Sequence, residues 1–287
     1  MQPKLRRVRA MNPSAMTGSG TNSYILGQGQ VAIIDPGPDD AGHLRALLAA
    51  LDPGETVAAI LVSHAHLDHS GLVPQLSAAT GAPVYAFGRA DEGRSAVMQA
   101  LVLQGLRGGG EGVDLAFAPD CRIAEGDDLS VGGLTIEVLH TPGHMAGHLC
   151  FACDGLLFSG DHAMGWATSL VSPPDGDMGD YMASLERLAA RNWRRMLPGH
   201  GDEVADPAAR LAELHAHRRQ READVLAELT RAPGTAAQLA ARIYREVSPA
   251  LLPAASRNVL AHLIDLATTN RVVTAGQISA ESAFHPK

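Results

Sequence analysis

The chain has 287 residues, of which 46% are hydrophobic and 19% charged, and its formal net charge is −8. This composition is typical of a globular protein, and the three cysteines argue against a disulfide framework. No apolar run approaches the roughly 18 residues of a membrane span. The basic N-terminus has no apolar segment of the kind found in secretory signals. We therefore expect a cytoplasmic protein with no membrane partner.

Charge is distributed unevenly along the chain. Residues 1–206 contain 24 acidic and 13 basic residues, whereas residues 207–287 contain 7 acidic and 10 basic ones. The asymmetry predicts two units, a catalytic domain at 1–206 and a small C-terminal domain at 207–287.

Short apolar runs alternate with helical patterns over the first 200 residues. Strands are predicted at 30–35, 58–63, 83–87, 134–140, 149–153 and 155–160, with a short closing run at 194–200. Helices are predicted from Asp40 along the face of Leu44, Leu47, Leu48 and Leu51, from Ser70 to near Gly81, and around Met182, Leu185 and Leu188. Cys150 and Cys153 lie three apart in a strand, so we expect them on opposite faces, as small buried residues. Whether residues 88–120, with their glycine-rich 105–114, form a lid stays open.

The C-terminal unit is predicted to contain three helices and a β-wing. A charged helix is predicted over 208–230, amphipathic helices over 235–247 and 254–269, and a short strand pair within 271–276. This outline is that of a winged-helix module, a relative of the helix-turn-helix.

Residues 63–71, SHAHLDHSG, follow a predicted buried strand and concentrate metal-binding side chains. Imidazole is the commonest protein ligand for zinc, and carboxylate is the next oxygen donor. His64 and His66 are spaced to reach one ion, while Asp68 and His69 can face a second. Three imidazoles this close would repel each other when protonated, so a metal site is the favoured interpretation.

Three further candidate ligands stand just after strand-like runs. They are His144 in VLHTPGH, Asp161 in LLFSGD and His200 in RMLPGH. A Pro-Gly pair before both histidines predicts a tight turn. Seven candidate ligands at several strand ends fit two metal ions at one edge of an α/β scaffold.

The order HAHLDH, TPGH, SGD and PGH, over roughly residues 18–203, resembles the metallo-β-lactamase superfamily of dinuclear hydrolases. The resemblance implies an α/β fold, the αββα sandwich, and two divalent ions, with zinc favoured. It assigns His64, His66 and His144 to one ion, Asp68, His69 and His200 to the other, and Asp161 to a bridge between them. Asp35 is expected to support the ligands. The implied chemistry is attack by a metal-bridging hydroxide that Asp68 orients as the catalytic carboxylate.

The substrate class is less constrained. A lactamase-type domain followed by a winged helix resembles the endoribonuclease-type lactamase-like proteins, which implies a phosphodiesterase acting on single-stranded RNA. The alternatives are a thioesterase of glyoxalase II type acting on a small molecule, and a winged-helix nucleic-acid-binding protein with a vestigial metal site. A mononuclear iron persulfide dioxygenase also stays open.

The remaining basic residues carry weaker expectations. His148 and His162 flank ligands and are candidates for contact with the ligands or the substrate, and His140 is expected to be structural. His43, His215, His217, His262 and His285 are expected at the surface or at helix caps. The HRRQRE stretch at 217–222 is interpreted as a solvated helix face or a phosphate contact. The winged helix itself is expected to cover the rim of the site or to form a homodimer surface.

Overall fold

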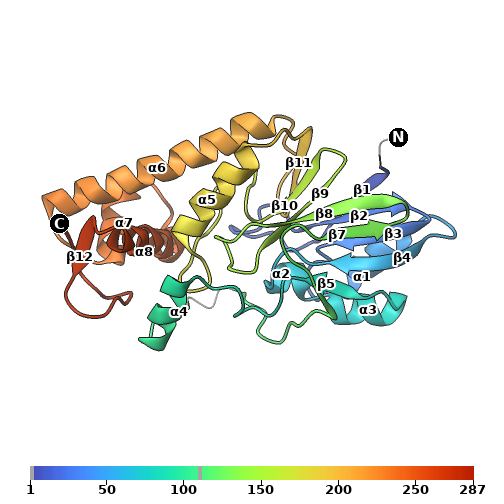
Figure 1. Cartoon of the computed structure of the whole chain (residues 1–287), viewed down its shortest axis with the longest axis horizontal. Helices are drawn as coiled ribbons and strands as arrows, with labels where there is room; N and C mark the ends of the chain where they lie inside the picture. Colours follow the sequence, from blue (N-terminus) through green and yellow to red (C-terminus); the bar gives the residue numbers. More distant parts are fainter. Residues whose placement is uncertain (1–2, 109–111) are drawn as a thin grey trace.

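The computed structural model describes residues 3–108 and 112–287, so the centre of the predicted glycine-rich segment, 109–111, lies outside the described residues. Two sheets lie face to face in one half of the molecule, and a helical C-terminal unit forms the other half (Figure 1).

The first sheet has six strands, and its N-terminal part is antiparallel. Strands β1, β2 and β3 form consecutive antiparallel pairs, after which β4, β5 and β6 are added in parallel. In spatial order the strands are β1 (Leu5–Arg9), β2 (Asn22–Gln28), β3 (Gln30–Ile34), β4 (Thr56–Leu61), β5 (Val84–Ala86) and β6 (Cys121–Arg122).

The second sheet has five strands, of which only β10 and β11 are parallel neighbours. In spatial order they are β11 (Arg195–Pro198), β10 (Leu156–Gly160), β9 (Leu149–Cys153), β8 (Leu134–His140) and β7 (Asp128–Val131).

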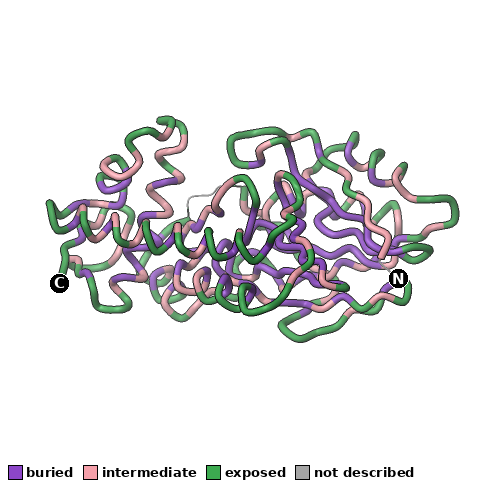
Figure 2. The backbone as a smooth tube through the Cα atoms, turned by 90° about the horizontal axis from the view of Figure 1, so that it is seen from above, coloured by how far each residue is buried: buried purple, intermediate pink, exposed green. Residues whose placement is uncertain are grey.

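Successive side chains of a strand point to opposite faces of its sheet, so the two sheets contribute to three apolar layers. Ile33 faces helices α1 (Ala41–Ala49) and α3 (Val73–Thr80), whereas its neighbour Ile34 faces the second sheet. The outer face of the second sheet packs on α5 (Met178–Ala189). The buried strands form the centre of this half, with exposed helices and loops around them (Figure 2). The architecture is therefore the αββα sandwich that the resemblance implied.

The C-terminal unit contains three α-helices and a small two-stranded sheet. These elements are α6 (Pro207–Arg231), α7 (Ala236–Ile243), the 3₁₀ helix η1 (Pro249–Leu251), α8 (Leu252–Thr268), β12 (Val272–Thr274) and β13 (Phe284–Pro286). Helix α6 belongs to both halves: Leu211 and Leu214 pack in the core of the second sheet, while Val225 and Leu229 pack on α7 and α8. The predicted boundary at residue 206 is therefore crossed by an extensive apolar contact.

Several predicted elements differ from the structure. The metal-rich motif contains its own short helix, α2 (Leu67–Ser70), so the prediction of one helix starting at Ser70 is wrong. The partner of β12 is β13, so the predicted strand pair within 271–276 is also wrong. Strand β1 and helix α4 (Ala96–Leu103) were not predicted. Cys150 and Cys153 do lie on opposite faces of β9, both buried.

Among the described residues, none of the helices combines the length and the apolar character needed to span a bilayer.

Candidate metal centre

The seven predicted ligands converge at one edge of the two sheets. His64 follows β4, His144 follows β8, Asp161 follows β10 and His200 follows β11. His66 lies at the start of α2, which carries Asp68 and His69 in its single turn. Strand ends fix these backbones because the strands on either side are paired and buried, so the short loops that follow have little freedom.

Donor atoms form two groups of three. In the first group, Nδ1 of His66 lies 2.9 Å from Nε2 of His64 and 3.1 Å from Nε2 of His144. In the second, Nε2 of His200 lies 3.2 Å from a carboxylate oxygen of Asp68 and 3.4 Å from Nε2 of His69. Each group gathers its donor atoms within 4.8 Å of one another.

Asp161 lies between the two groups. One of its carboxylate oxygens is 3.4 Å from Nε2 of His69, and the other is 3.3 Å from His200 and 3.9 Å from His144. A carboxylate in this place can offer one oxygen to each group, which is the geometry that a bridging ligand needs.

Hydrogen bonds on the outer sides of the rings determine which nitrogens face the centre. His69 donates from Nδ1 to Asp35, and His144 donates from Nδ1 to the carbonyl of Leu170 at 2.6 Å. Ser63 donates its hydroxyl proton to Asp35, so its oxygen accepts from Nδ1 of His64 at 2.9 Å. The Nε2 atoms of these rings are therefore turned inward, as in metal-ligating histidines, and in the neutral rings of His64 and His144 they carry the lone pair.

The donor set fits a divalent cation. Nε2 of His64 and Nε2 of His144 both point at Nδ1 of His66 from about 3 Å, and a single proton on that nitrogen can satisfy only one of them. A cation among the three nitrogens satisfies all of them. The group of three histidines and the mixed group of two histidines and Asp68 both supply the ligand types that zinc and related ions prefer.

Asp35 supports both groups from behind. Its backbone has φ of +51°, a left-handed conformation that is uncommon outside glycine and is most accessible to Asp and Asn. The side chain accepts from the amide of Ser63 at 2.7 Å and its hydroxyl at 2.8 Å, and from Nδ1 of His69 at 3.0 Å. The carboxylate therefore orients one histidine of each group, directly or through Ser63.

Replacing Asp35 by Asn is expected to weaken metal binding by about 10- to 100-fold, because the amide replaces one acceptor oxygen with a donor. Competition with a chromophoric chelator would measure the affinity. Asp39→Asn is the matched control, since Asp39 is an exposed carboxylate four residues away that contacts only Gln75 among the hydrogen-bonded side chains described. Wild-type metal affinity in Asp35→Asn would show that this support is dispensable.

The two groups differ in their electrostatics. Burial removes water from the imidazolium forms and lowers the pKa of His64 and His144, and it lowers the pKa of His66 to about 3. Burial acts in the same direction on His200, but the carboxylates of Asp161 and Asp68 outweigh it and raise the pKa of His200 to about 9. The same carboxylates, with Asp35, raise the pKa of His69 well above its usual value.

Both carboxylates in the centre are held ionised. Burial alone would raise the pKa of Asp68, but the neighbouring His69 and His200 lower it below its usual value. The same two histidines hold the pKa of Asp161 well below its usual range. The centre thus keeps two negative charges available for cations at neutral pH.

Two glycines allow the predicted turns to bring their histidines inward. A Cβ on Gly199 would lie 2.6 Å from a carboxylate oxygen of Asp161 and from a ring carbon of His69. A Cβ on Gly143, whose φ is +143°, would lie 2.4 Å from Cα of Tyr181. The Pro-Gly pairs therefore provide space for ligands and for α5, as well as a tight turn.

His148 and His162 lie behind the ligands and are fully buried, away from the reach of a substrate. His148 accepts from the amide of Asp161 at 3.3 Å through Nε2 and contacts the Thr141 hydroxyl through Nδ1. His162 packs against the ring of Tyr181 at a centroid distance of 4.7 Å. Of the two roles expected for this pair, the structure favours contact with the ligand-bearing segments.

Three predictions of surface position are wrong. His43, on the inner face of α1, is buried and contacts the Ser23 hydroxyl, and His262 is buried on α8. Arg218, within the stretch expected to be a solvated helix face, is also buried. Sequence reasoning missed these positions because residue type favours exposure, whereas the positions face other segments of the fold.

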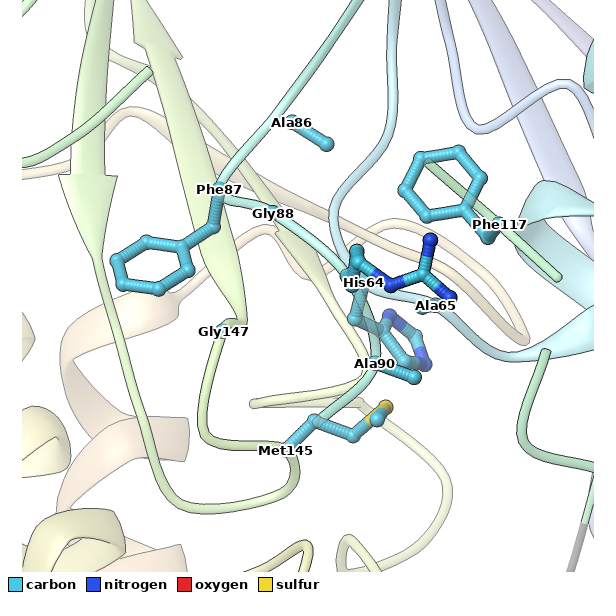
Figure 3. A pocket seen from close by; sticks show the side chains of 10 residues that line it. His64, Ala65, Ala86, Phe87, Gly88, Ala90, Phe117, Met145 and Gly147 are labelled. Atoms are coloured by element: carbon cyan, nitrogen blue, oxygen red, sulfur yellow. The ribbon is translucent and has the colours of Figure 1, made fainter. Parts of the chain in front are cut away.

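An apolar wall borders the first group of ligands. Ala86, Phe87, Phe117 and Met145 line a small pocket together with His64 (Figure 3). These apolar side chains contribute to the lowered pKa of His64. An imidazolium there would lose its hydration, and among the described residues no carboxylate lines that side of the ring to compensate.

Comparison with known proteins agrees with this geometry. The sequence profile of the metallo-beta-lactamase superfamily matches residues 16–200, and that of the beta-lactamase associated winged helix domain matches residues 235–280. A beta-lactamase-like protein 2 homolog of Drosophila melanogaster is 32% identical over 271 residues, covering 91% of this chain and 86% of the relative. An atrochrysone carboxyl ACP thioesterase of Aspergillus fumigatus is 30% identical over 237 residues, covering 80% of this chain and 66% of the relative.

Solved structures extend the similarity to the whole chain. A metallo-beta-lactamase family protein from Thermus thermophilus is 26% identical, has a TM-score of 0.78, and covers 99% of this chain and 98% of its own. A beta-lactamase domain protein from Burkholderia ambifaria shares the fold, with a TM-score of 0.80, 24% identity and coverage of 99% and 91%. The chain therefore belongs to the metallo-beta-lactamase superfamily and carries the winged-helix domain associated with it.

Proposed function

We propose that this protein is a metal-dependent hydrolase of carboxylic thioesters with an apolar acyl group. The observation that carries the proposal is the set of exposed apolar side chains on the segments that adjoin the metal centre. Such side chains are typical of ligand-binding surfaces when they cluster around a polar site.

Each of these side chains lies on a segment tied to a ligand. Leu67 is 50% exposed and stands between His66 and Asp68. Trp166 is 45% exposed and its ring lies against Gly18 and Gly201, beside His200. Met16 is 45% exposed on the loop that leads to Thr21, whose hydroxyl donates to Asp68. Leu115 is 72% exposed on the segment that pairs with His66 through Val113.

Charge and relatives support the same substrate class. A phosphodiester backbone is bound mainly by cationic residues, whereas residues 1–206 carry 24 acidic and 13 basic side chains. Among the relatives, the atrochrysone carboxyl ACP thioesterase is named for hydrolysis of an acyl thioester, and it matches most of this chain.

The chain's own residues would carry out the steps around the ions. Divalent ions held by the seven ligands, with two zinc ions as our proposal, supply the Lewis acidity that activates water and polarises a carbonyl oxygen. Asp68 stays ionised, accepts from Thr21 at 3.3 Å, and can orient the attacking water and accept its proton. Asp35 and Leu170 keep the ligand histidines in the required tautomers.

A phosphodiesterase stays as a second candidate because the winged-helix unit carries a hollow lined by arginines. Arg221, Arg231, Arg242 and Arg245 line it between α6 and α7. Asp224 and Glu228 pair with two of these arginines, which reduces the charge available to a nucleic acid. A cytoplasmic location and a homodimer remain proposals from the sequence.

A side-by-side assay tests the proposal. The metal-loaded protein would be offered a decanoyl thioester of N-acetylcysteamine, bis(p-nitrophenyl) phosphate, a single-stranded RNA and a cephalosporin. We expect the highest kcat/KM on the thioester, with loss of that activity in Asp68→Asn. Cleavage of the RNA without turnover of the thioester would replace the proposal by the phosphodiesterase.

Replacing Trp166 by Ala is expected to lower kcat/KM for the decanoyl thioester by about tenfold, because the acyl chain loses part of its apolar contact surface. The acetyl thioester should change by less than about twofold, since its acyl group is too short to use that surface. Val273→Ala, an exposed apolar residue of β12, is the control. Equal losses on both thioesters would mean that Trp166 does not bind the acyl chain.

A further inference from the structure

We propose that Arg218 and Asn258, which belong to helices of the C-terminal unit, are positioning residues for the metal ligand His144. Arg218 and Asn258 do not touch His144 themselves; the backbone of residues 169–171 lies between them and that histidine. The carbonyl of Leu170 accepts from Nδ1 of His144 at 2.6 Å and so directs the other ring nitrogen at the metal centre.

The C-terminal unit holds the residue on each side of that carbonyl. Arg218, on α6, donates from Nη2 to the carbonyl of Ser169. Asn258, on α8, accepts from the amide of Val171 at 3.0 Å. Nη1 of Arg218 also donates to the amide oxygen of Asn258 at 3.2 Å, which joins the two contacts. Leu170 is thus fixed between two anchored peptide groups.

Arg218 is an unusual residue for a purely structural role. Its side chain is buried at 2% exposure, and its guanidinium lies 5.0 Å from the centroid of the Tyr181 ring. Within residues 3–108 and 112–287, no carboxylate lies at ion-pair distance from it. Burial of an unpaired cation costs stability compared with an apolar residue of similar size. We therefore infer that Arg218 serves to fix the groups it binds, the Ser169 carbonyl and the Asn258 side chain.

Ser169, whose carbonyl Arg218 binds, also contacts the backbone of a second ligand, Asp161. The hydroxyl of Ser169 lies at hydrogen-bond distance from the backbone carbonyls of Asp161 and, at 2.8 Å, of His162, and its one proton is shared between them. The Tyr181 hydroxyl also donates to the carbonyl of His162, at 3.0 Å. The segment held by Arg218 therefore constrains the backbone of Asp161 as well as the ring of His144. Helix α6 runs from the second sheet into the C-terminal unit, so the two halves meet at this point (Figure 1).

The winged-helix unit thereby has a role in building the metal centre. This role is in metal binding and does not depend on which bond the enzyme cleaves. Because outer contacts of ligand histidines set metal affinity, loss of the contact should appear as weaker binding of the ion held by His64, His66 and His144.

The test measures Zn²⁺ binding to the full chain by competition with a chromophoric chelator. We expect Arg218→Met and Asn258→Leu to weaken one of the two metal equivalents by about tenfold or more, and His144→Ala to identify which one. Asn258→Asp keeps an acceptor for Val171 and Arg218, so it should stay within about threefold of wild type. Arg219→Met changes an exposed arginine on the same helix and should leave both equivalents unchanged.

Thermal unfolding of the metal-free variants separates positioning from folding. A lower unfolding temperature with wild-type affinity for both equivalents would make Arg218 and Asn258 structural only and would overturn the proposal. If Arg218→Met does not fold, the pair Asn258→Leu and Asn258→Asp decides, because the two differ chiefly in the acceptor offered to Val171. Equal affinities in that pair would also overturn it.

Discussion

Replacing Asp68 by Asn is expected to lower kcat by about 10²- to 10⁴-fold, the range that a positioned general base contributes. Asp68 is the more exposed carboxylate of the centre, with 27% of its side chain accessible against 12% for Asp161. It therefore combines contact with the metal group and access to an attacking water. The amide is neutral, cannot accept the proton, and offers one oxygen instead of two.

Steady-state rates and metal content would be measured on the same preparations. Asp202→Asn is the matched control, because Asp202 is exposed, follows His200 closely in sequence and pairs with Arg7. Its kcat should stay within about twofold of wild type. Near-wild-type turnover by a fully metal-loaded Asp68→Asn protein would exclude Asp68 as the catalytic base. His64→Ala is expected to lose turnover together with metal.

Metal binding is expected to depend strongly on pH for one equivalent and weakly for the other. In the metal-free protein His69 and His200 have raised pKa values, about 9 for His200, and hold protons at pH 7 beside Asp68 and Asp161. A metal must displace these protons. His64, His66 and His144 have lowered pKa values and are already neutral, so their ion displaces none.

Below pH 9 the affinity of the group containing His69 and His200 should rise with pH, by up to about 10² per pH unit if both protons are released together. The affinity of the three-histidine group should change by less than about tenfold between about pH 6 and 8. Chelator competition at several pH values, with proton release measured in a weak buffer, checks both statements. Two equivalents with the same pH dependence would contradict the assignment of charge to the groups.

The ligands could be predicted from the sequence because each interrupts a local pattern. Polar residues such as His64 and Asp161 stand after apolar runs that are predicted to be buried strands, and the structure confirms both strands. Strand ends of such a scaffold meet at one edge, so ligands distant in sequence were expected together there. Their arrangement in the structure follows that expectation, while their binding of metal stays a prediction.

Elements with a weak local signal were missed. Strand β1, LRRVR, carries three arginines at the edge of the first sheet, and it forms because β2 offers it a partner. Helix α4 is apolar on more than one face, and it is stabilised where Met98 and Leu101 pack on the C-terminal unit. In both cases the stabilising partner lies in another segment, which local periodicity cannot report.

The sequence by itself determined the winged-helix outline and the seven candidate ligands, because these depend on periodicity and on residue types at strand ends. It indicated the αββα class through the motifs that resemble the metallo-β-lactamase superfamily. Only the tertiary structure decided that Arg218 is buried, that the Leu170 carbonyl directs His144, and that α6 belongs to both halves. A backbone carbonyl has no signature in the sequence, and the burial of a charged side chain depends on which distant segment packs over it.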